Sequence, residues 1–237
     1  MSIISFSRYF IENAEYLSKQ SGMPVVYELK PKEIFHVFSA HDAATQLLEY
    51  QKKNHCAYVI YHSENIDSVF FKNRDYIKLM RKNKVVHYSP MIAAICQSWH
   101  KVDCAGFFTF DYEPLTANVT RDIDLLFFGA MNQCRYDILK YIQNARPDLR
   151  VTVTCDAFGE DLNKLLVRSK CVINISFYER NALETHRINK ALSAGCRVIS
   201  NESADEQMNK KYKDIICFTS GRTLCDFLNA INSVFSK

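Results

Sequence analysis

The sequence lacks the long apolar runs that mark membrane and secreted proteins. Nowhere do about 18 apolar residues follow one another, so we expect no integral membrane segment. The N-terminal stretch MSIISFSRYFIENAEY carries an acidic residue at position 12 and no apolar run long enough for a signal peptide. We therefore expect a cytoplasmic protein of 237 residues, or a domain pair from a larger multidomain chain.

Paired metal-binding motifs are also absent, although the chain has nine cysteines. No CxxC pair occurs and no histidines stand at a matching spacing, so no metal site is predicted. Most of the cysteines lie inside apolar runs, such as CAYVIY and CVINI. We expect them to be small buried side chains in a reducing compartment.

A concentrated block of positive charge is missing as well. The net charge of +4 and the pI near 8.5 are only mildly basic. This balance suits a small anionic ligand, but it falls short of the Lys/Arg clusters typical of nucleic-acid-binding proteins. Nucleic acid is therefore not an expected partner.

The chain does contain a regular alternation of apolar runs and amphipathic stretches. Short runs rich in β-branched and aromatic residues predict strands at 25–29, 33–39, 56–61, 84–89, 105–110, 122–129, 150–154, 171–176, 196–201 and 214–220. Apolar spacing near 3.6 predicts helices at 42–53, 72–82, 90–99, 132–145, 159–169, 181–195 and 223–235. The strand runs are continuous, which is typical of parallel strands that helices cover on both faces. The predicted fold class is α/β with doubly wound parallel sheets.

One stretch, DYEPLTANVTR at 111–121, is polar, contains a proline and shows no periodicity. A boundary placed there predicts two Rossmann-like domains, residues 1–115 and 116–237, with the last helix packing across the boundary. Two such domains facing each other would form a cleft. In open α/β sheets ligands bind beyond the carboxyl ends of the strands, so the loops that follow strands are where a site is expected.

The loop after the strand at 122–129 suggests an anion site. Gly129 ends the strand, Asn132 stands where a helix N-cap is expected, and Arg135 lies one turn further on. Helix amides and a guanidinium together suit a diphosphate. A tight turn at Gly129 with a solvated Arg135 is the structural alternative, because one glycine is far weaker than a G-x-G-x-x-G motif.

The loop in CDAFGEDLNKLL joins a predicted strand to the next helix. Its backbone around Phe158 is placed to border a nucleobase. Its acidic residues, however, are also expected at a helix start, where they stabilise the helix dipole without any ligand.

The stretch FYERNALETHRINKALSAGCRVIS, at 177–200, places a carboxylate on an otherwise apolar helix face. At about 100° per residue, Glu184 falls in one sector with Ile188 and Ala191, whereas His186 and Lys190 fall on the other side. A buried carboxylate is costly unless it is satisfied, and two neighbouring ribose hydroxyls satisfy one well. The alternative is a glutamate that stabilises the helix dipole.

This stretch, with FFGAMNQCRYDIL and FGEDLNKLLVRSKCVINI before it, resembles the nucleotide-sugar-binding half of GT-B glycosyltransferases. AYVIYHSENIDSVFF and RDYIKLMRKNKVVHYSP are similar to the acceptor half of small members, and the resemblance covers about 56–203. It implies transfer of a sugar, a hexose or a pentose, from a nucleoside diphosphate sugar of UDP or GDP type. The acceptor would be a hydroxyl of a glycan, and no cofactor would be needed.

The resemblance also implies roles for single residues. Glu184 matches the glutamate that holds the donor ribose, Glu179 lies near the one that faces the donor sugar, and Arg135 would face the diphosphate. Four residues separate Glu179 from Glu184, where the family has seven, so the role of Glu179 and the stereochemical outcome stay open. Further donor-binding positions expected in the same stretch are Tyr178, Asn181, Ala182 and Leu183. Arg187 is expected to supply positive charge for the diphosphate, with a surface salt bridge to Glu184 or Glu179 as the alternative.

Sugar transfer needs a base for the acceptor hydroxyl and positive charge for the departing diphosphate. His62 and Glu64, after the predicted strand at 56–61, are the candidate bases, with an internal hydrogen-bonding role as the alternative for either residue. The one Asp-x-Asp, at 122–124, runs into a strand, so we expect transfer without a metal ion. The competing hypotheses are a nucleotide or nucleotide-sugar binding module without catalysis, and another Rossmann-like transferase.

Overall fold

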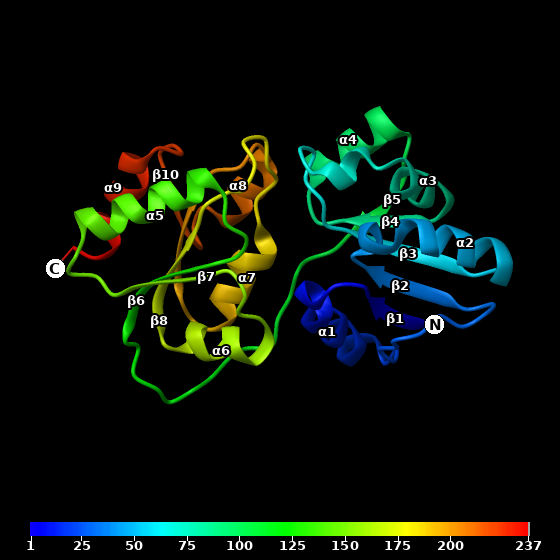
Figure 1. The fold of residues 1–237 in the computed structure, drawn as a ribbon, viewed down its shortest axis with the longest axis horizontal. Coiled ribbons are helices and arrows are strands. Elements are labelled where there is room, and N and C mark those ends of the chain that lie inside the picture. Colours follow the sequence, from blue (N-terminus) through cyan, green and yellow to red (C-terminus); the bar gives the residue numbers. More distant parts are fainter. Residues whose placement is uncertain (237) are drawn as a thin grey trace. The chain divides into compact units, whose positions relative to one another are not determined.

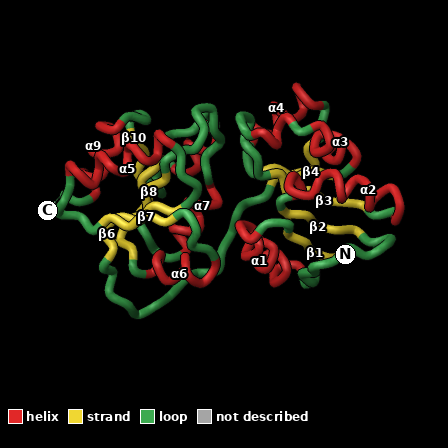
Figure 2. Tube along the Cα trace, in the orientation of Figure 1, coloured by secondary structure: helices red, strands yellow, loops and turns green. Residues whose placement is uncertain are grey.

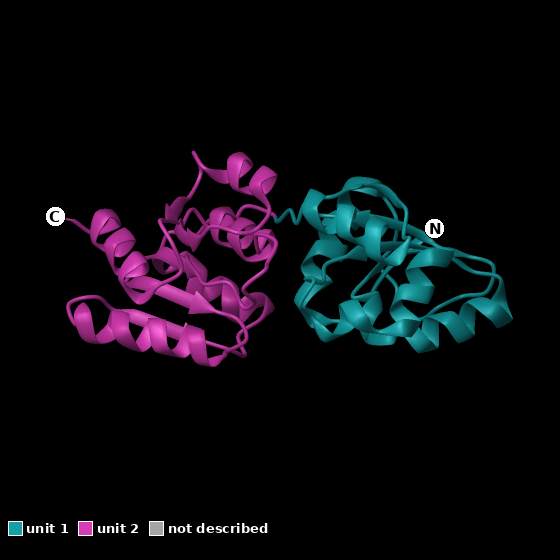
Figure 3. Cartoon of the chain, turned by 90° about the horizontal axis from the view of Figure 1, so that it is seen from above, with its two compact units in different colours: residues 1–112 teal, residues 113–237 magenta. Residues whose placement is uncertain are grey.

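The computed structural model describes residues 1–236, which form two compact units (Figure 3). Unit 1 is Met1–Tyr112 and unit 2 is Glu113–Lys237. The predicted boundary, between residues 115 and 116, lies close to this division. No helix in the described part of the chain is long and apolar enough to cross a membrane.

Unit 1 is a five-stranded parallel sheet whose strands follow one another in sequence order, β1-β2-β3-β4-β5 (Figure 1). Its strands are β1 Ser2–Ser5, β2 Ile34–Phe38, β3 Ala57–His62, β4 Lys84–His87 and β5 Cys104–Phe107. Its α-helices are α1 Ile11–Ser21, α2 Ala44–Asn54, α3 Arg74–Lys82 and α4 Pro90–His100. Short 3-10 turns, η1 Arg8–Phe10, η2 Ala40–Ala43 and η3 Val69–Lys72, precede three of these helices.

The N-terminal part of unit 1 differs from the prediction. The run at 25–29 is not a strand, because Val25 forms a single parallel bridge with Ile3 and the chain then leaves the sheet, with Tyr27 exposed. The place in the sheet belongs to β1, which was not predicted, and neither were α1 and, in unit 2, α8. The four-residue β1 and the seven-residue α8 are too short to show a clear period.

Strands β3, β4 and β5 of unit 1 alternate in burial, unlike the continuous burial that was expected. In β3, Tyr58, Ile60 and His62 are buried while the residues between them are partly exposed, and β4 follows the same pattern with Val85 and His87. Successive side chains of a strand point to opposite faces, so both histidines share the face of the core residues.

Unit 2 is a second five-stranded parallel sheet, with strand order β10-β9-β8-β6-β7 (Figures 1 and 2). Its strands are β6 Ile123–Phe128, β7 Val151–Thr154, β8 Ser169–Asn174, β9 Arg197–Asn201 and β10 Cys217–Thr219. Its helices are α5 Gln133–Ala145, α6 Gly159–Val167, α7 Thr185–Ser193, α8 Glu206–Tyr212 and α9 Leu224–Val234. From β6 the chain first builds outward to β7 and then returns to the other side of β6 with β8. The order of connection therefore reverses between β6 and β8, which is the topological switch point of the sheet.

Helices cover both faces of the unit 2 sheet, which confirms the doubly wound prediction for this half. One core cluster joins β6, β8 and β9 to α6, α7 and α8, and the other joins the opposite face of the same strands to α5 and α9. All six residues of β6 are consequently buried. The apolar face of α9, with Phe227, Ala230 and Ile231, is buried in this second core, whereas the prediction sent the last helix across the domain boundary.

Candidate functional site

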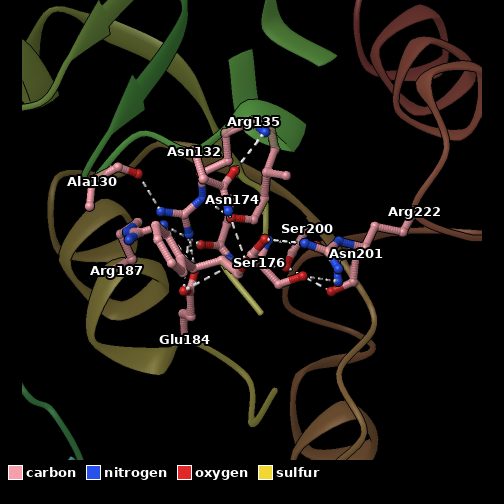
Figure 4. Close-up of polar contacts among 12 residues, drawn as sticks. Ala130, Asn132, Arg135, Asn174, Ser176, Glu184, Arg187, Ser200, Asn201 and Arg222 are labelled. Carbon is pink, nitrogen blue, oxygen red and sulfur yellow. Dashed lines mark hydrogen bonds and ion pairs between the residues drawn. The ribbon is translucent and has the colours of Figure 1, made fainter. Parts of the chain in front are cut away.

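Polar side chains gather at the carboxyl ends of the central strands of unit 2 (Figure 4). We call this group the strand-end cluster; its members are Asn132, Arg135, Asn174, Ser176, Glu184, Arg187, Ser200, Asn201 and Arg222. Asn174 ends β8, Ser200 and Asn201 end β9, and the other members come from the loops and helix starts that follow β6, β8 and β10. The cluster thus lies at and beside the β6–β8 switch point, where ligands bind in open α/β sheets.

Glu184 is at the centre of the cluster and is 6% exposed. Its Oε1 accepts from Arg135 Nη2 at 3.0 Å and from the Phe177 amide at 3.4 Å, and its Oε2 accepts from Arg135 Nη2 at 3.0 Å and Arg187 Nη1 at 2.9 Å. Burial alone would raise the pKa of Glu184, but Arg187 and Arg135 outweigh burial and hold the pKa below its ordinary value. Glu184 is therefore a buried carboxylate whose roughly four acceptor positions are used by protein donors.

The alternative role of Glu184, stabilisation of the helix dipole, agrees with its position at the start of α7 but does not account for its side-chain contacts. Helix α7 begins at Thr185, four residues later than predicted, and Glu184 is its N-cap residue without a side-chain capping bond. The chain at 176–184 is instead an irregular loop that carries Glu184 back to the strand ends.

Arg135 is completely buried, which corrects the interpretation of this residue as a solvated side chain; its contact with a diphosphate stays a prediction. Its Nε donates to the Ile175 carbonyl at 2.8 Å and its Nη1 to the Ala130 carbonyl at 2.6 Å, while Nη2 serves Glu184. Burial and the nearby Arg187 lower the pKa of Arg135 to about 10, so the guanidinium is still charged at neutral pH. Arg135 thus connects the loop after β6 to the loop after β8, and its guanidinium donors bond to protein acceptors.

Arg187 is held between Glu184 and the end of β8. Its Nη1 donates to Glu184 and, at 3.3 Å, to Asn174 Oδ1, and the residue is 7% exposed. Its guanidinium also lies against Gly129, which has a φ of +127°. A Cβ on Gly129 would stand 2.6 Å from Arg187 Nη2, so the glycine makes room for the arginine besides making the turn.

The ends of β8 and β9 are joined by amide and hydroxyl side chains. Asn174 Nδ2 donates to Ser200 Oγ at 2.9 Å, and Asn201 accepts from the Ser176 amide at 2.9 Å and donates to Ser176 Oγ at 3.0 Å. Arg222, in the loop before α9, donates from Nη2 to the Ser176 carbonyl at 2.7 Å. Its Nε is buried without a hydrogen-bond partner.

Asn132 closes the cluster on the α5 side, as the sequence predicts. Its Oδ1 accepts from the Arg135 amide at 2.9 Å, which makes it the N-cap of α5, and its Nδ2 donates to the Phe177 carbonyl at 2.9 Å. The same side chain therefore starts the helix and fixes the loop that follows β8.

Helix α7 is more buried than its predicted faces suggest. Lys190, which was expected on the solvent side, is 5% exposed because α8 also covers this face of the unit. Burial, together with Arg187, lowers the pKa of His186 to about 4, so this imidazole is neutral at pH 7.

The remaining donor-binding predictions fall into two groups. Asn181, Ala182 and Leu183 are buried in the loop before α7, where the Asn181 carbonyl accepts from the Ala204 amide at 2.9 Å and Leu183 joins the apolar core. Glu179 is exposed on the same loop, and the ring of Tyr178 packs edge-on against Phe177 at 4.9 Å. Phe158 is the N-cap residue of α6, after the edge strand β7, which carries no member of the cluster.

The two predicted catalytic bases lie in unit 1. His62 is completely buried, and its Nδ1 is 2.7 Å from Tyr76 Oη. Burial, reinforced by His87, lowers its pKa well below the usual value. A base must reach the proton it takes, so this geometry fits the internal hydrogen-bonding role and not the catalytic one. Glu64 is partly exposed; it accepts from Ser68 Oγ at 2.5 Å and pairs with His41 Nε2 at 3.1 Å.

Sequence reasoning missed Asn174, Ser176, Ser200, Asn201 and Arg222. A signal for the first four was available, because each is a polar residue at the end of a continuous apolar strand. Parallel neighbouring strands end at the same sheet edge, so such residues must meet. Nothing in the sequence marks Arg222, whose place depends on where the chain goes after β10.

Chemically, the cluster has more positive than negative charge. The cluster holds three guanidinium groups, Arg135, Arg187 and Arg222, and one carboxylate, Glu184, which pairs with Arg135 and Arg187. Besides burial, the positive charges of Arg187 and Arg222 both act on Arg135 and lower its pKa. The start of α5 lies at the same sheet edge, and helix N-terminal amides also favour anions. The arrangement is suited to a small ligand with two or more negative charges.

Comparison with known proteins agrees at the level of the fold. No protein-family model matches the sequence. No curated protein matches it either.

Solved structures do match. HepE from Anabaena, in complex with UDP and glucose, superposes with a TM-score of 0.65 at 10% identity, covering 100% of this chain and 90% of HepE. WaaG, a glycosyltransferase involved in lipopolysaccharide biosynthesis, gives a TM-score of 0.62 at 7% identity, covering 100% of this chain and 91% of WaaG. A glycosyltransferase from Rickettsia africae gives 0.57 at 12% identity, with 99% and 88% covered. All have the GT-B fold, and so does this chain, as two Rossmann-like units with parallel sheets.

Proposed function

We propose that the protein is a glycosyltransferase that moves a sugar from a nucleoside diphosphate sugar to a hydroxyl of a glycan acceptor. The observation that carries the proposal is the strand-end cluster, which places an excess of guanidinium charge at the switch point of the unit 2 sheet. The HepE structures with UDP and UDP-glucose support a uridine diphosphate hexose over a GDP sugar. In this proposal the residues of the strand-end cluster form the donor site in unit 2.

In this proposal the diphosphate meets Arg187, Arg222 and the first amides of α5. Arg187 uses only Nη1 in its described side-chain hydrogen bonds, and Arg222 only Nη2. Guanidinium groups bind phosphate oxygens with two parallel donors and stabilise the charge that develops on a departing diphosphate. These cations take the place of a metal ion in the transfer step, which we propose to be metal-independent.

Arg135 and Glu184 act in this proposal mainly as positioning residues. Arg135 has all three guanidinium nitrogens bonded within the protein, and Glu184 fixes Arg187. A ribose diol could reach Glu184 only by replacing one of the arginine bonds, so the ribose contact stays a prediction that ligand binding must test.

A binding and hydrolysis panel tests the proposal. UDP, GDP and their hexose derivatives are added to the full chain, and the melting temperature and the release of free sugar are measured. We expect stabilisation by the UDP series and slow hydrolysis of one UDP sugar. No stabilisation by any nucleoside diphosphate would overturn the proposal, and stabilisation without turnover would favour the binding module.

Substitutions locate the site. Arg222→Ala should weaken UDP binding about 10-fold to 100-fold, because a charge-assisted hydrogen bond contributes about 1.5–3 kcal/mol. The matched control is Arg168→Ala. Arg168 lies just before β8, at the amino ends of the strands, and pairs with Asp122 just before β6. Equal losses in both variants would show that UDP binds by general charge attraction and not in the cluster.

Glu64 is the acceptor-side base in this proposal. Glu64→Gln should lower kcat at least about 100-fold, the usual contribution of general base catalysis, and leave UDP affinity unchanged. The paired variant Ser68→Ala removes the hydroxyl that bonds Glu64 but keeps the carboxylate. An unchanged kcat in Glu64→Gln would assign the base elsewhere.

A further inference from the structure

Three potential metal ligands meet in the interior of unit 1. Their spacing in the sequence matches no known metal-binding motif. They are His62 at the end of β3, His87 at the end of β4 and Cys96 on α4. Each is 0% exposed, and one donor atom from each lies within 4.8 Å of the other two. β3 and β4 are neighbours in which His62 is the register partner of His87, so the sheet itself sets the two rings side by side.

The ring nitrogens of this group are unusual because they have no hydrogen-bond partners. His87 Nδ1, His87 Nε2 and His62 Nε2 are all buried without a partner. Buried polar atoms are nearly always satisfied, and an exception calls for an explanation such as an ion. Other side chains of this core satisfy their polar atoms; Tyr58 Oη, for example, donates to the Leu47 carbonyl at 3.1 Å.

The second ring nitrogen of His62 supports the same explanation. His62 Nδ1 lies 2.7 Å from Oη of the buried Tyr76. A metal on Nε2 requires the proton on Nδ1, which then donates to Tyr76 Oη. Metal-bound histidines typically donate their other ring N–H to such an outer partner, which fixes the ring orientation.

We propose that unit 1 binds a zinc ion through His62 Nε2, one ring nitrogen of His87 and Cys96 Sγ. Two imidazoles and a thiolate are a ligand set that zinc prefers, and three protein ligands leave one position of a tetrahedral ion for a further ligand. Zinc–nitrogen and zinc–sulfur bonds of about 2.0–2.3 Å put tetrahedral ligand atoms roughly 3.5 Å apart, so the three side chains move together by about an ångström on binding. Cys96 binds as the thiolate, and its proton is released to solvent.

The proposed ion joins β3, β4 and α4 and does not touch the strand-end cluster, which belongs to unit 2. It is a structural site, separate from the metal-independent transfer proposed above. Either proposal can fail without the other. Burial explains why zinc would enter as unit 1 folds, since metal binding and folding are coupled at such sites.

Metal content tests the proposal. The full chain is produced with zinc under reducing conditions and dialysed into metal-free buffer. Bound zinc is then measured by inductively coupled plasma mass spectrometry. We expect about one zinc per chain, and background levels in Cys96→Ser and His87→Phe. The control Cys171→Ser changes a cysteine of unit 2 that is equally buried and that belongs to no group of potential metal ligands among residues 1–236, so this variant should keep its zinc.

A second measurement needs no variant, in case the substitutions prevent folding. X-ray absorption at the zinc edge of the parent protein should show one sulfur neighbour at about 2.3 Å and nitrogen neighbours at about 2.0 Å. A zinc shell without sulfur, zinc retained by Cys96→Ser as in the parent, or background zinc in the parent would each overturn the site. The histidines would then be neutral core side chains packed ring against ring.

Discussion

At the scale of single residues, Glu184 shows what sequence can and cannot supply. The sequence places this carboxylate on a buried helix face, and the structure indeed buries it. Its partners could not be deduced, because Arg135 is 49 positions away and reaches Glu184 only once β6 and β8 are neighbours. The burial of Arg135 could not be deduced for the same reason. Helix periodicity shows on which face of the helix a residue lies, but not which loop covers that face.

Arg135→Ala should be strongly destabilising. It leaves the Glu184 carboxylate in the interior with one arginine fewer, and breaking a buried pair in this way costs about 3–5 kcal/mol. Urea unfolding of parent and variant measures the change. Arg168→Ala breaks an exposed pair and should have a much smaller effect.

A double variant separates the interaction energy of the Arg135–Glu184 pair from the contributions of the two side chains to other contacts. If the two residues interact as described, Arg135→Ala and Glu184→Ala together should cost clearly less than the sum of the single variants. Additive costs would contradict the pairing.

Gly129→Ala should disturb Arg187. The backbone at this position has a φ of +127°, which alanine rarely adopts. The added methyl group would also stand 2.6 Å from Arg187 Nη2. We expect a loss of about 1–3 kcal/mol in the free energy of unfolding, together with weaker UDP binding. Chemical denaturation and calorimetric titration measure the two effects.

Gly22→Ala is the matched control for Gly129→Ala. Gly22 also has a positive φ, of +72°, but a Cβ there meets nothing within 4 Å. This variant should lose stability of about 1–2 kcal/mol, from backbone strain alone, and keep its UDP affinity. A normal UDP affinity in Gly129→Ala would remove Arg187 from the site.

At the scale of elements, periodicity located most helices and strands but not their order in the sheets. Continuous apolar runs correctly indicated buried parallel strands in unit 2, where helices cover both faces. They gave no means to find that β8 returns beside β6, because pairing between strands leaves no local pattern. In unit 1 the run AYVIYH is apolar at nearly every position, so the sequence contained no sign that alternate residues of β3, His62 among them, face the core.

The start of α9 carries a capping box that should matter for the stability of unit 2. Thr223 Oγ1 accepts from the Asp226 amide at 3.3 Å, and Asp226 Oδ2 accepts from the Thr223 amide at 2.8 Å. Thr223→Ala should cost about 1 kcal/mol, the usual effect of losing an N-cap. Thr116→Ala, an exposed threonine in the segment after the unit boundary, is the control and should be nearly neutral.

The cost of Thr223→Ala should depend on pH. Hydrogen bonds from the Thr223 hydroxyl and amide, and from Ser220, lower the pKa of Asp226 below 3.8. A carboxyl whose folded pKa is lowered stabilises the fold above its unfolded pKa, and this contribution is lost as the pH falls through the folded value. The stability difference between parent and variant should therefore shrink below about pH 4 in urea titrations. A difference that stays constant down to pH 2 would contradict this role for Asp226.

At the scale of the whole molecule, the two units differ in the topology of their sheets. The unit 1 sheet runs β1 to β5 in order and has no switch point, whereas the unit 2 sheet reverses between β6 and β8. The sequence correctly indicated two Rossmann-like halves, and the ligand loops in the second half stay a prediction. It could not indicate the histidine and cysteine group of unit 1, because those residues are 25 and 9 positions apart and only register brings them together.

This division predicts that two ligands protect different parts of one chain in hydrogen exchange. Ligands stabilise the state that binds them, and local opening is resisted most where the ligand bonds. UDP should slow amide exchange in β6, the start of α5 and residues 174–188, and zinc should slow exchange in β3, β4 and α4. Arg222→Ala should remove only the first effect and Cys96→Ser only the second. Protection by UDP confined to unit 1, or by zinc confined to unit 2, would contradict the assignment of these ligands to their units.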